Sequence, residues 1–375
     1  MRVLMISKAC IAGAYQRKLE EIAALGVDLT VVVPPYWRDD AGRKAPLERQ
    51  FTNGYRLVVE PMAFNGHFHY LFYPRLWRRF RDVKPDVLHM DEEAYNLSTL
   101  EGFLMAQRVG ARPLFFTWQN LLRHYPPPYA WIERYCQARA AGAICGNAEA
   151  VDVLRQKGYD GPTWVIPQFG IDPALFRPVP ELRQEREAAG APFTVGFCGR
   201  LRERKGELLL VRAVAALGGD ARLEILGWGE AEPRVRALAA ELGIADRVRI
   251  HAAMPSTEVP RFLNRLDVLA APSLTLPSWK EQFGRVLMEA MACGVPVAGS
   301  NSGEIAHVIG DAGLLFPEGD VPALTECLRH LRDDANLRHD LSERGLARAR
   351  ALYTHQRIAE QTVAAYRQVL GSTAK

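Results

Sequence analysis

Hydrophobic positions along the chain form short continuous runs that alternate with stretches of helical periodicity. Because these runs are apolar throughout, each predicted strand is expected to be buried on both faces, as in a parallel sheet covered by helices. About a dozen such strands exceed what one doubly wound sheet usually holds, so the pattern predicts an α/β fold of two doubly wound sheets. The predicted strands are Val3–Ser7, Leu29–Pro34, Tyr55–Glu60, Asp86–Met90, Leu114–Trp118, Ala143–Gly146, Trp164–Pro167, Thr194–Gly199, Leu223–Gly227, Val248–His251, Val268–Ala271 and Val295–Ala298.

A proline-rich segment predicts the boundary between two domains. Four prolines occur from Pro167 to Pro180, and a polar helical stretch follows before the strand that begins at Thr194. We therefore expect a first domain over residues 1–170 and a second over residues 171–354. The last helix, about His355–Leu370, carries apolar residues spaced for one face.

Composition narrows the class of protein without defining it. The 375 residues are 48% hydrophobic and 24% charged, which fits an ordinary globular protein. A net charge of +4 is too mild for a nucleic-acid binder but is compatible with an anionic substrate or membrane surface. The six cysteines form no Cys-x-x-Cys pair, which favours buried free thiols in a reducing compartment. No apolar run suits a signal peptide or a membrane span, so we expect a cytoplasmic protein.

Two glutamates flank the start of one predicted helix. The periodicity predicts a helix over Phe283–Ala292, ended by Gly294 and followed by the short strand Val295–Ala298. Glu281 and Glu289 are then separated by roughly 12 Å along the axis, with the anion-favouring helix N-terminus between them. This layout matches the sugar hydroxyls, diphosphate and ribose hydroxyls of a nucleotide sugar. A surface helix with two solvated glutamates is the alternative that spacing alone leaves open.

The same stretch also resembles a known family. Its residues EQFGRVLMEAMACGVPV resemble the signature of retaining glycosyltransferases of family 4, which have the GT-B fold. The resemblance implies two Rossmann-like domains facing across a cleft, with the terminal helix 355–375 joined to the first. It implies that Glu281 contacts the donor sugar and Glu289 the ribose, with Phe283 and Gly284 also at the donor.

A basic loop follows the strand that begins at Thr194. Arg200 and Lys205 are five residues apart across a glycine-containing loop, so they can converge on one anion. The pattern Gly-Arg-x4-Lys-Gly resembles the diphosphate-binding element of the family. Standing alone, the loop would be interpreted as a solvated basic turn.

Other glycine-containing loops follow predicted strands. Gly13 follows the first strand, where a glycine allows close approach to a phosphate or sugar, although family members usually carry a glycine pair there. Ser302 and Gly303 belong to a segment that resembles the family's loop near the donor phosphate, and Ser or Asn is expected to cap the helix that follows. The Gly227–Gly229 segment is interpreted as an ordinary turn, with a nucleotide contact as the alternative.

The first domain is expected to bind the acceptor. Glu92 and Glu93 follow a strand and are candidates to orient an acceptor hydroxyl, although a solvated acidic turn fits equally. Gln119 occupies a position where many family members carry a histidine near the donor sugar. A glutamine there can hydrogen-bond a hydroxyl but cannot shuttle a proton. His124 is a weaker candidate nearby.

Residues 67–84 mix aromatic side chains with five cationic ones. One hypothesis is that this segment makes peripheral contact with an anionic membrane surface or binds an anionic acceptor. The favoured alternative is a core helix with a solvated basic face. On the membrane hypothesis, the protein acts at the inner face of the membrane.

The expected chemistry is metal-independent sugar transfer. No His, Asp or Cys cluster has metal-ligand spacing, and no cofactor is expected beyond the donor substrate, a UDP- or GDP-linked sugar. Arg200, Lys205 and helix amides would stabilise the leaving diphosphate. The acceptor would be a hydroxyl of a glycan, a glycolipid or a small molecule. The alternatives are a glycoside phosphorylase, a nucleotide-sugar epimerase of the same fold and a non-catalytic nucleotide-sugar-binding module.

Overall fold

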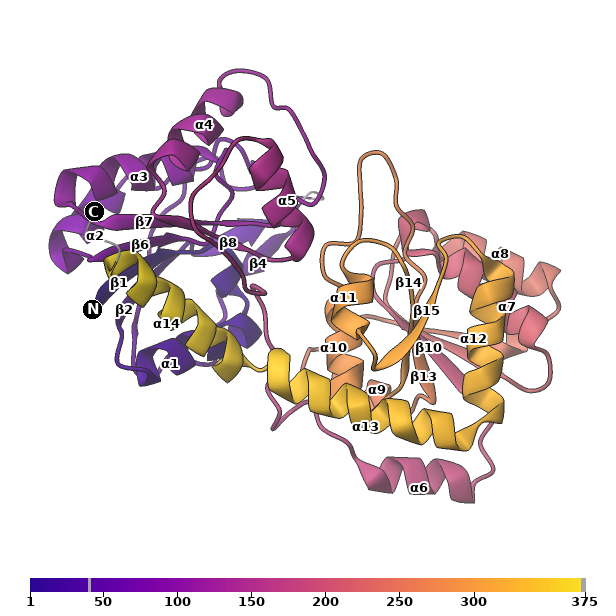
Figure 1. The fold of residues 1–375 in the computed structure, drawn as a ribbon. Helices are drawn as coiled ribbons and strands as arrows, with labels where there is room; N and C mark the ends of the chain where they lie inside the picture. The colour runs from indigo at the N-terminus through magenta and orange to yellow at the C-terminus, as the bar shows by residue number, and fades with distance from the viewer. Residues whose placement is uncertain (40–41, 372–375) are drawn as a thin grey trace. The chain divides into compact units, whose positions relative to one another are not determined.

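The computed structural model describes residues 1–39 and 42–371 and divides into two compact units (Figure 1). Unit 1 comprises Met1–Gly170 together with the terminal helix α14 (His355–Gly371), and unit 2 comprises Ile171–Thr354. Each unit has its own sheet and hydrophobic core. The last four residues of the predicted terminal segment 355–375 lie outside the described residues.

Unit 1 is built on a seven-stranded parallel sheet in the order β5-β2-β1-β6-β7-β8-β9. The chain moves outward from β1 in one direction through β2 and in the other through β6, so the order reverses between β1 and β6. In doubly wound sheets, ligands bind at the carboxyl ends of the strands at this reversal. The strands are β1 (Arg2–Ile6), β2 (Asp28–Val33), β5 (Arg56–Val59), β6 (Val87–Met90), β7 (Arg112–Thr117), β8 (Gly142–Cys145) and β9 (Thr163–Val165).

Helices cover both faces of this sheet, which explains the continuous apolar runs of its strands. α1 (Arg17–Ala24) and α14 lie side by side on one face, where Val363 and Tyr366 share a core with Leu19 (Figure 1). The other face packs against α2 (Leu76–Val83), α3 (Leu97–Val109), α4 (Tyr129–Arg139) and α5 (Ala148–Gln156).

Unit 2 repeats this plan with six parallel strands in the order β12-β11-β10-β13-β14-β15. The order reverses between β10 and β13. The strands are β10 (Thr194–Cys198), β11 (Arg222–Leu226), β12 (Val248–His251), β13 (Val268–Ala271), β14 (Val297–Ser300) and β15 (Gly313–Phe316). The helices are α6 (Pro180–Ala188), α7 (Glu207–Leu217), α8 (Glu232–Glu241), α9 (Val259–Leu263), α10 (Arg285–Ala292), α11 (Ile305–Ile309), α12 (Val321–Asp333) and α13 (Ala335–Leu352). The predicted fold class of two doubly wound parallel sheets is confirmed.

Two boundaries around α10 differ from the prediction. The helix begins at Arg285 rather than Phe283, because Gly284 adopts a left-handed backbone with φ of 76°. The following strand begins at Val297 rather than Val295, because the Val295 amide donates to the Ala290 carbonyl and completes the helix end.

Two further features were not anticipated from the sequence. β15 is four residues long and leaves Leu315 exposed, so its apolar run is too short to stand out. β3 (Tyr36–Arg38) and β4 (Lys44–Pro46) form an antiparallel pair of only three residues each, without a buried side chain. Neither feature carries the periodicity from which strands were predicted.

Candidate active site

The loops that follow β10 and β13 carry the main cluster of charged side chains in unit 2. These strands are neighbours at the reversal of the strand order, so residues just beyond their carboxyl ends are brought together. Arg200 and Lys205 follow β10, and Glu281 follows β13. The topology therefore unites two predicted site segments that are far apart in the sequence.

Glu281 is the centre of this cluster. Its Oε2 accepts a hydrogen bond of 2.6 Å from Lys205 Nζ and one of 2.8 Å from Ser273 Oγ. Glu281 is buried, whereas the Lys205 side chain is 27% exposed. A buried carboxylate held by two donors has a fixed orientation, and its cationic partner remains partly accessible to an anion.

Three arginines, Arg200, Arg202 and Arg204, lie in the same loop. The Arg200 guanidinium lies over the Trp228 ring at 4.2 Å, and its Nε is buried without a hydrogen-bond partner among the described residues. Burial and the nearby Arg202 lower the pKa of Arg204, whose guanidinium lies over Trp279. Cations packed this closely favour an anionic ligand, because it would offset their mutual repulsion.

Glycines set the path of this loop. Gly206 has φ of 73° and begins α7, and a Cβ there would lie 1.9 Å from the Pro272 carbonyl oxygen. A Cβ at Gly227 or Gly229 would lie 1.9 or 2.1 Å from the carbonyl oxygens of Gly199 and Leu201. These two glycines pack against the backbone of the basic loop, which supports the interpretation of their segment as a structural turn.

The N-terminus of α10 lies beside this cluster in the sequence and has no side-chain cap. Gly284 is the N-cap residue and makes no side-chain cap bond, while its carbonyl accepts a 2.9 Å hydrogen bond from the Leu287 amide. Phe283, a predicted donor contact, is buried edge-to-face against Tyr353 with ring centroids 5.7 Å apart. Its side chain is therefore a core residue, and Gly284 is the position that shapes the helix start.

Glu289 is buried on α10 and forms a 3.0 Å ion pair with Arg285. Burial raises the pKa of its carboxyl, and Arg285 opposes this shift. An acidic group in this setting is prepared to accept hydrogen bonds from neutral hydroxyls, such as those of a ribose.

The loop containing Ser302 and Gly303 lies against Glu281. A Cβ on Gly303 would lie 2.0 Å from the Glu281 carbonyl oxygen, and the Glu304 amide donates to that same oxygen. The Ser302 side chain is fully buried and bonds Thr275 at 3.0 Å. The expectation that Ser or Asn caps α11 was wrong, because Glu304 is the N-cap residue and makes no side-chain cap bond.

In unit 1, charged residues also meet at the reversal of the strand order. Asp91 follows β6 and accepts a 2.6 Å hydrogen bond from Ser7 Oγ after β1. Glu92 forms a short ion pair with Lys8, and burial raises the pKa of its carboxyl against the opposing effect of Lys8. Glu92 is buried within the unit, which excludes the interpretation of a solvated acidic turn.

Glu93 and Gln119 lie in partly buried polar contacts of unit 1. Glu93 accepts a 2.8 Å hydrogen bond from the Trp118 amide, and burial raises the pKa of its carboxyl. The Gln119 amide donates to Glu133 at 3.3 Å and accepts from Lys157 at 2.8 Å. Its side chain is thus held by Glu133 and Lys157 within unit 1.

The remaining two candidates are Gly13, which is buried, and His124, which is exposed to solvent. The Gly13 amide donates to Glu48 Oε2 at 2.7 Å, and a Cβ at Gly13 would collide with Gln50. His124 is exposed in the loop that precedes α4. Within residues 1–39 and 42–371, no three His, Cys, Asp or Glu side chains are grouped as metal ligands.

Comparison with known proteins identifies the family. The model of glycosyl transferases group 1 matches residues 178–348, and that of glycosyltransferase family 4 matches residues 16–175. The chain belongs to glycosyltransferase family 4. The two matches together cover both units, as the resemblance of residues 281–297 predicts.

Relatives of the family share about a third of their aligned residues with this chain. The 2-deoxystreptamine N-acetyl-D-glucosaminyltransferase of Streptomyces fradiae is 29% identical over 68% of this chain and 64% of its own length. The D-inositol 3-phosphate glycosyltransferase of Stackebrandtia nassauensis is 34% identical over 64% of this chain and 57% of its own length. The chain thus spans less than two thirds of the length of these relatives.

Solved structures show that the fold is GT-B. Sucrose-phosphate synthase from Thermosynechococcus elongatus superposes with a TM-score of 0.78 at 21% identity, covering all of both chains. Anabaena HepE in complex with UDP superposes with a TM-score of 0.76 at 18% identity, covering 98% of this chain and all of its own.

Several residues of the site carried no local sequence signal. Ser273, Trp228 and Trp279 stand at the site beside the predicted charged residues, and Ser7 and Lys8 fix the acidic residues of unit 1. All five follow a strand of one of the two sheets. Their position next to the reversal of the strand order is the signal that could have identified them.

Proposed function

We propose that the protein is a retaining glycosyltransferase that moves a sugar from a nucleotide diphosphate to an acceptor hydroxyl. The observation that carries this proposal is the Glu281 carboxylate, which Lys205 and Ser273 hold beside the basic loop and the uncapped start of α10. A carboxylate next to an anion site suits a substrate that joins a sugar to a phosphate.

Each element of the site has a defined task in this reaction. Arg200, Lys205 and the first amides of α10 bind the diphosphate and stabilise the charge that grows on it as the glycosidic bond breaks. Glu281 accepts hydrogen bonds from the sugar hydroxyls, and Glu289 accepts those of the ribose. The acceptor hydroxyl attacks from the same face as the leaving phosphate, which takes up the hydroxyl proton. The configuration of the sugar is then retained.

Unit 1 supplies the acceptor site in this proposal. Glu92 and Glu93 lie at the carboxyl ends of its strands, where ligands bind in doubly wound sheets. The related enzymes named above act on 2-deoxystreptamine and on D-inositol 3-phosphate, which are ring compounds with several polar substituents. A polyhydroxylated ring, free or attached to a lipid, is the acceptor class that we propose.

Calorimetric titration with UDP, GDP and ADP in excess EDTA tests the donor site. Tight binding of one nucleotide supports the proposal and identifies the donor, for which we expect a UDP- or GDP-linked sugar. A strict requirement for a divalent cation would contradict the metal-independent mechanism. Failure of all three nucleotides to bind would favour the phosphorylase. Release of free sugar without an acceptor excludes a binding module, and release of a rearranged sugar indicates an epimerase.

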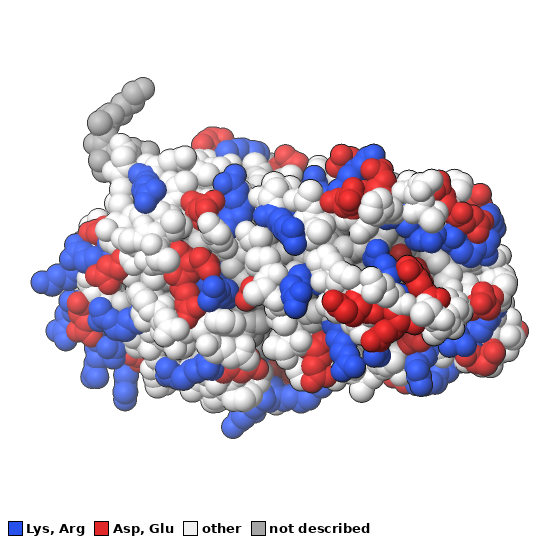
Figure 2. Space-filling view, turned by 90° about the horizontal axis from the view of Figure 1, so that it is seen from below, with Lys and Arg blue, Asp and Glu red and all other residues white. Residues whose placement is uncertain are grey.

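We further propose peripheral membrane contact through residues 67–84. Leu76 and Phe80 anchor α2 in the core of unit 1, and its basic residues face outward. The face in Figure 2 shows Lys and Arg side chains with Asp and Glu side chains interspersed among them. The exposed residues of this segment are His67, Phe68, Tyr70, Pro74, Arg75, Trp77, Arg78, Arg81, Asp82 and Lys84. Salt-sensitive flotation with anionic but not neutral vesicles would support this contact, and its absence would refute it.

A cytoplasmic location follows from the same proposal. All six cysteines are free, as is typical of proteins in a reducing compartment. Among the helices of the described residues, none is both long enough and apolar enough to cross a membrane.

A further inference from the structure

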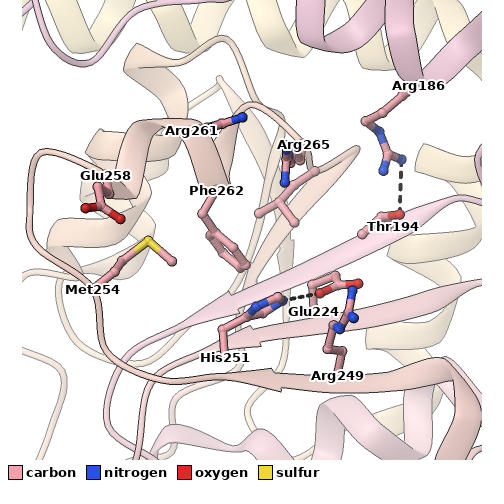
Figure 3. Close-up of a pocket in the computed structure, with 11 residues that line it drawn as sticks. Arg186, Thr194, Glu224, Arg249, His251, Met254, Glu258, Arg261, Phe262 and Arg265 are labelled. Carbon is pink, nitrogen blue, oxygen red and sulfur yellow. Dashed lines mark hydrogen bonds and ion pairs between the residues drawn. The ribbon is translucent and has the colours of Figure 1, made fainter.

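Unit 2 contains a pocket that shares no residue with the proposed donor site. It has a volume of about 370 Å³, within the size range of small-molecule sites, and is shown in Figure 3. Its residues are Arg186, Thr194, Glu224, Arg249, His251, Met254, Glu258, Arg261, Phe262, Arg265 and Leu266. Thr194 begins β10, whereas the basic donor loop follows the opposite end of that strand.

The pocket exists because a short helix covers part of one sheet face. Glu224 pairs in register with Arg249 on the neighbouring strand, and both line the pocket. The adjacent Leu223 and Ile225 belong to the core on the opposite face. The covering helix α9 has only five residues, and Leu266 beyond it packs against Gly196 of β10. The rest of the face therefore stays open.

Some of the charges in this pocket neutralise one another. Arg186 donates to Asp267 at 2.8 Å and to Thr194 at 3.0 Å. The Glu224 carboxylate and the His251 ring share a short hydrogen bond. These contacts hold the guanidinium and the carboxylate in place at the base of the pocket.

Three other arginines keep their full hydrogen-bonding capacity. Across the part of the chain that the structure describes, the side chains of Arg249, Arg261 and Arg265 make no hydrogen bond or ion pair. Glu258 is the one unpaired carboxylate among the lining residues of this pocket. The uncompensated charge of the pocket is therefore positive, and its donors have the planar geometry that binds phosphate through paired hydrogen bonds.

The charges are distributed unevenly along the pocket. Figure 3 shows Arg186, Arg249 and Arg265 toward one end, with Glu224 beside Arg249. Met254, Glu258 and Arg261 lie toward the other end, with Phe262 between the two groups. An anionic group fits the arginine end, and a less polar body with hydroxyl groups fits against Phe262 and Glu258. We infer that this pocket binds a small phosphorylated molecule, with its phosphate at Arg249 and Arg265 and its body at Phe262.

Titration of ribose 5-phosphate tests this second site. The full chain carrying Arg200→Ala/Lys205→Ala is used, because these changes remove the two charged side chains that are proposed to bind phosphate at the donor site. We expect saturable binding of one ribose 5-phosphate, and no binding of ribose, which lacks the phosphate. Added Arg249→Ala/Arg265→Ala should weaken binding about tenfold or more. Added Arg249→Lys/Arg265→Lys should retain part of the affinity, which excludes loss of folding as the cause.

The control pair Arg212→Ala/Arg329→Ala removes the same charge from two helix positions outside the pocket, of which Arg212 is exposed and Arg329 is half-buried and paired with Glu326. It should leave the affinity unchanged. Absence of ribose 5-phosphate binding, equal binding of ribose, or equal weakening by the control pair would overturn the inference. Because the assay involves neither a nucleotide donor nor sugar transfer, its failure is distinguishable from failure of the proposed function.

Discussion

At the scale of single residues, Glu281 lies between the proposed diphosphate contact and the proposed sugar contact of the donor site. Its carboxylate holds Lys205, which is proposed to bind the diphosphate, and is itself proposed to bind the sugar. Removing the charge should therefore disturb the reacting end of the substrate more than its nucleotide end. This difference separates a role in the reaction from a role in nucleotide affinity.

Glu281→Gln is expected to lower turnover about tenfold or more while changing the affinity for the nucleoside diphosphate by a smaller factor. Steady-state kinetics and nucleotide titration measure the two effects. Ser273→Ala, which removes a hydrogen bond but keeps the carboxylate, should have a milder effect. Equal losses of turnover and affinity in Glu281→Gln would contradict the assignment.

Glu289→Ala is expected to weaken binding of the nucleoside diphosphate about tenfold, because the ribose loses a hydrogen-bond acceptor. Isothermal titration calorimetry measures the change. Glu241→Ala, at an exposed position in the same unit, provides the control. Unchanged affinity in Glu289→Ala would refute the ribose role.

At the scale of elements, the donor site depends on how the loop after β10 enters α7. Gly206 combines a left-handed backbone with direct proximity to the Pro272 carbonyl, so it joins the loops that follow β10 and β13. Gly110, which ends α3 in unit 1, has nearly the same backbone (φ 74° and ψ 18°, against 73° and 19° at Gly206), but a Cβ there would meet no atom within 4 Å. The two positions separate the cost of the backbone conformation from the cost of moving the loop.

Gly206→Ala is expected to lower the free energy of unfolding by about 2 kcal/mol or more and to weaken nucleotide binding. Gly110→Ala should cost about 1 kcal/mol and leave nucleotide binding unchanged. Urea unfolding and calorimetry measure the two quantities. Equal behaviour of the two variants would show that contact with Pro272 does not position the site.

At the scale of the whole molecule, the terminal helix is built into the core of unit 1. Tyr366 of α14 is fully buried, and its hydroxyl bonds His89 Nδ1 at 2.7 Å across 277 residues of sequence. His355 begins the same helix and is also buried. Burial lowers the pKa of His89 to about 4 and that of His355 to about 3.

These histidines predict that stability falls in mild acid. The unfolded chain takes up protons on both imidazoles below about pH 6.5, whereas the folded chain does so only near pH 4 or below. As the pH falls from about 6.5 toward 4, the free energy of unfolding should therefore decrease by about 1.4 kcal/mol per pH unit for each histidine. Urea unfolding at several pH values measures the slope. His355→Gln should reduce the slope, and the exposed His124→Gln should leave it unchanged.

Much of the fold could be predicted from the sequence because its strands are buried on both faces. The apolar runs at Val3–Ser7 and Val268–Ala271 stand out from their polar surroundings, and each contains a strand of the structure. Short or half-exposed strands such as β15 lack this contrast. The helix end at Gly294 was predicted, whereas the helix start at Gly284 depended on a left-handed backbone that the pattern does not record.

For the site, the sequence by itself determined the family and the residue types that bind anions and hydroxyls, since these lie in continuous motifs. Only the tertiary structure decided which groups are paired. Lys205 meets Glu281 across 76 residues, Lys157 meets Gln119 across 38, and Glu48 meets the Gly13 amide across 35. Such contacts arise because neighbouring parallel strands bring distant loops to one edge of a sheet, which no local pattern of residues encodes.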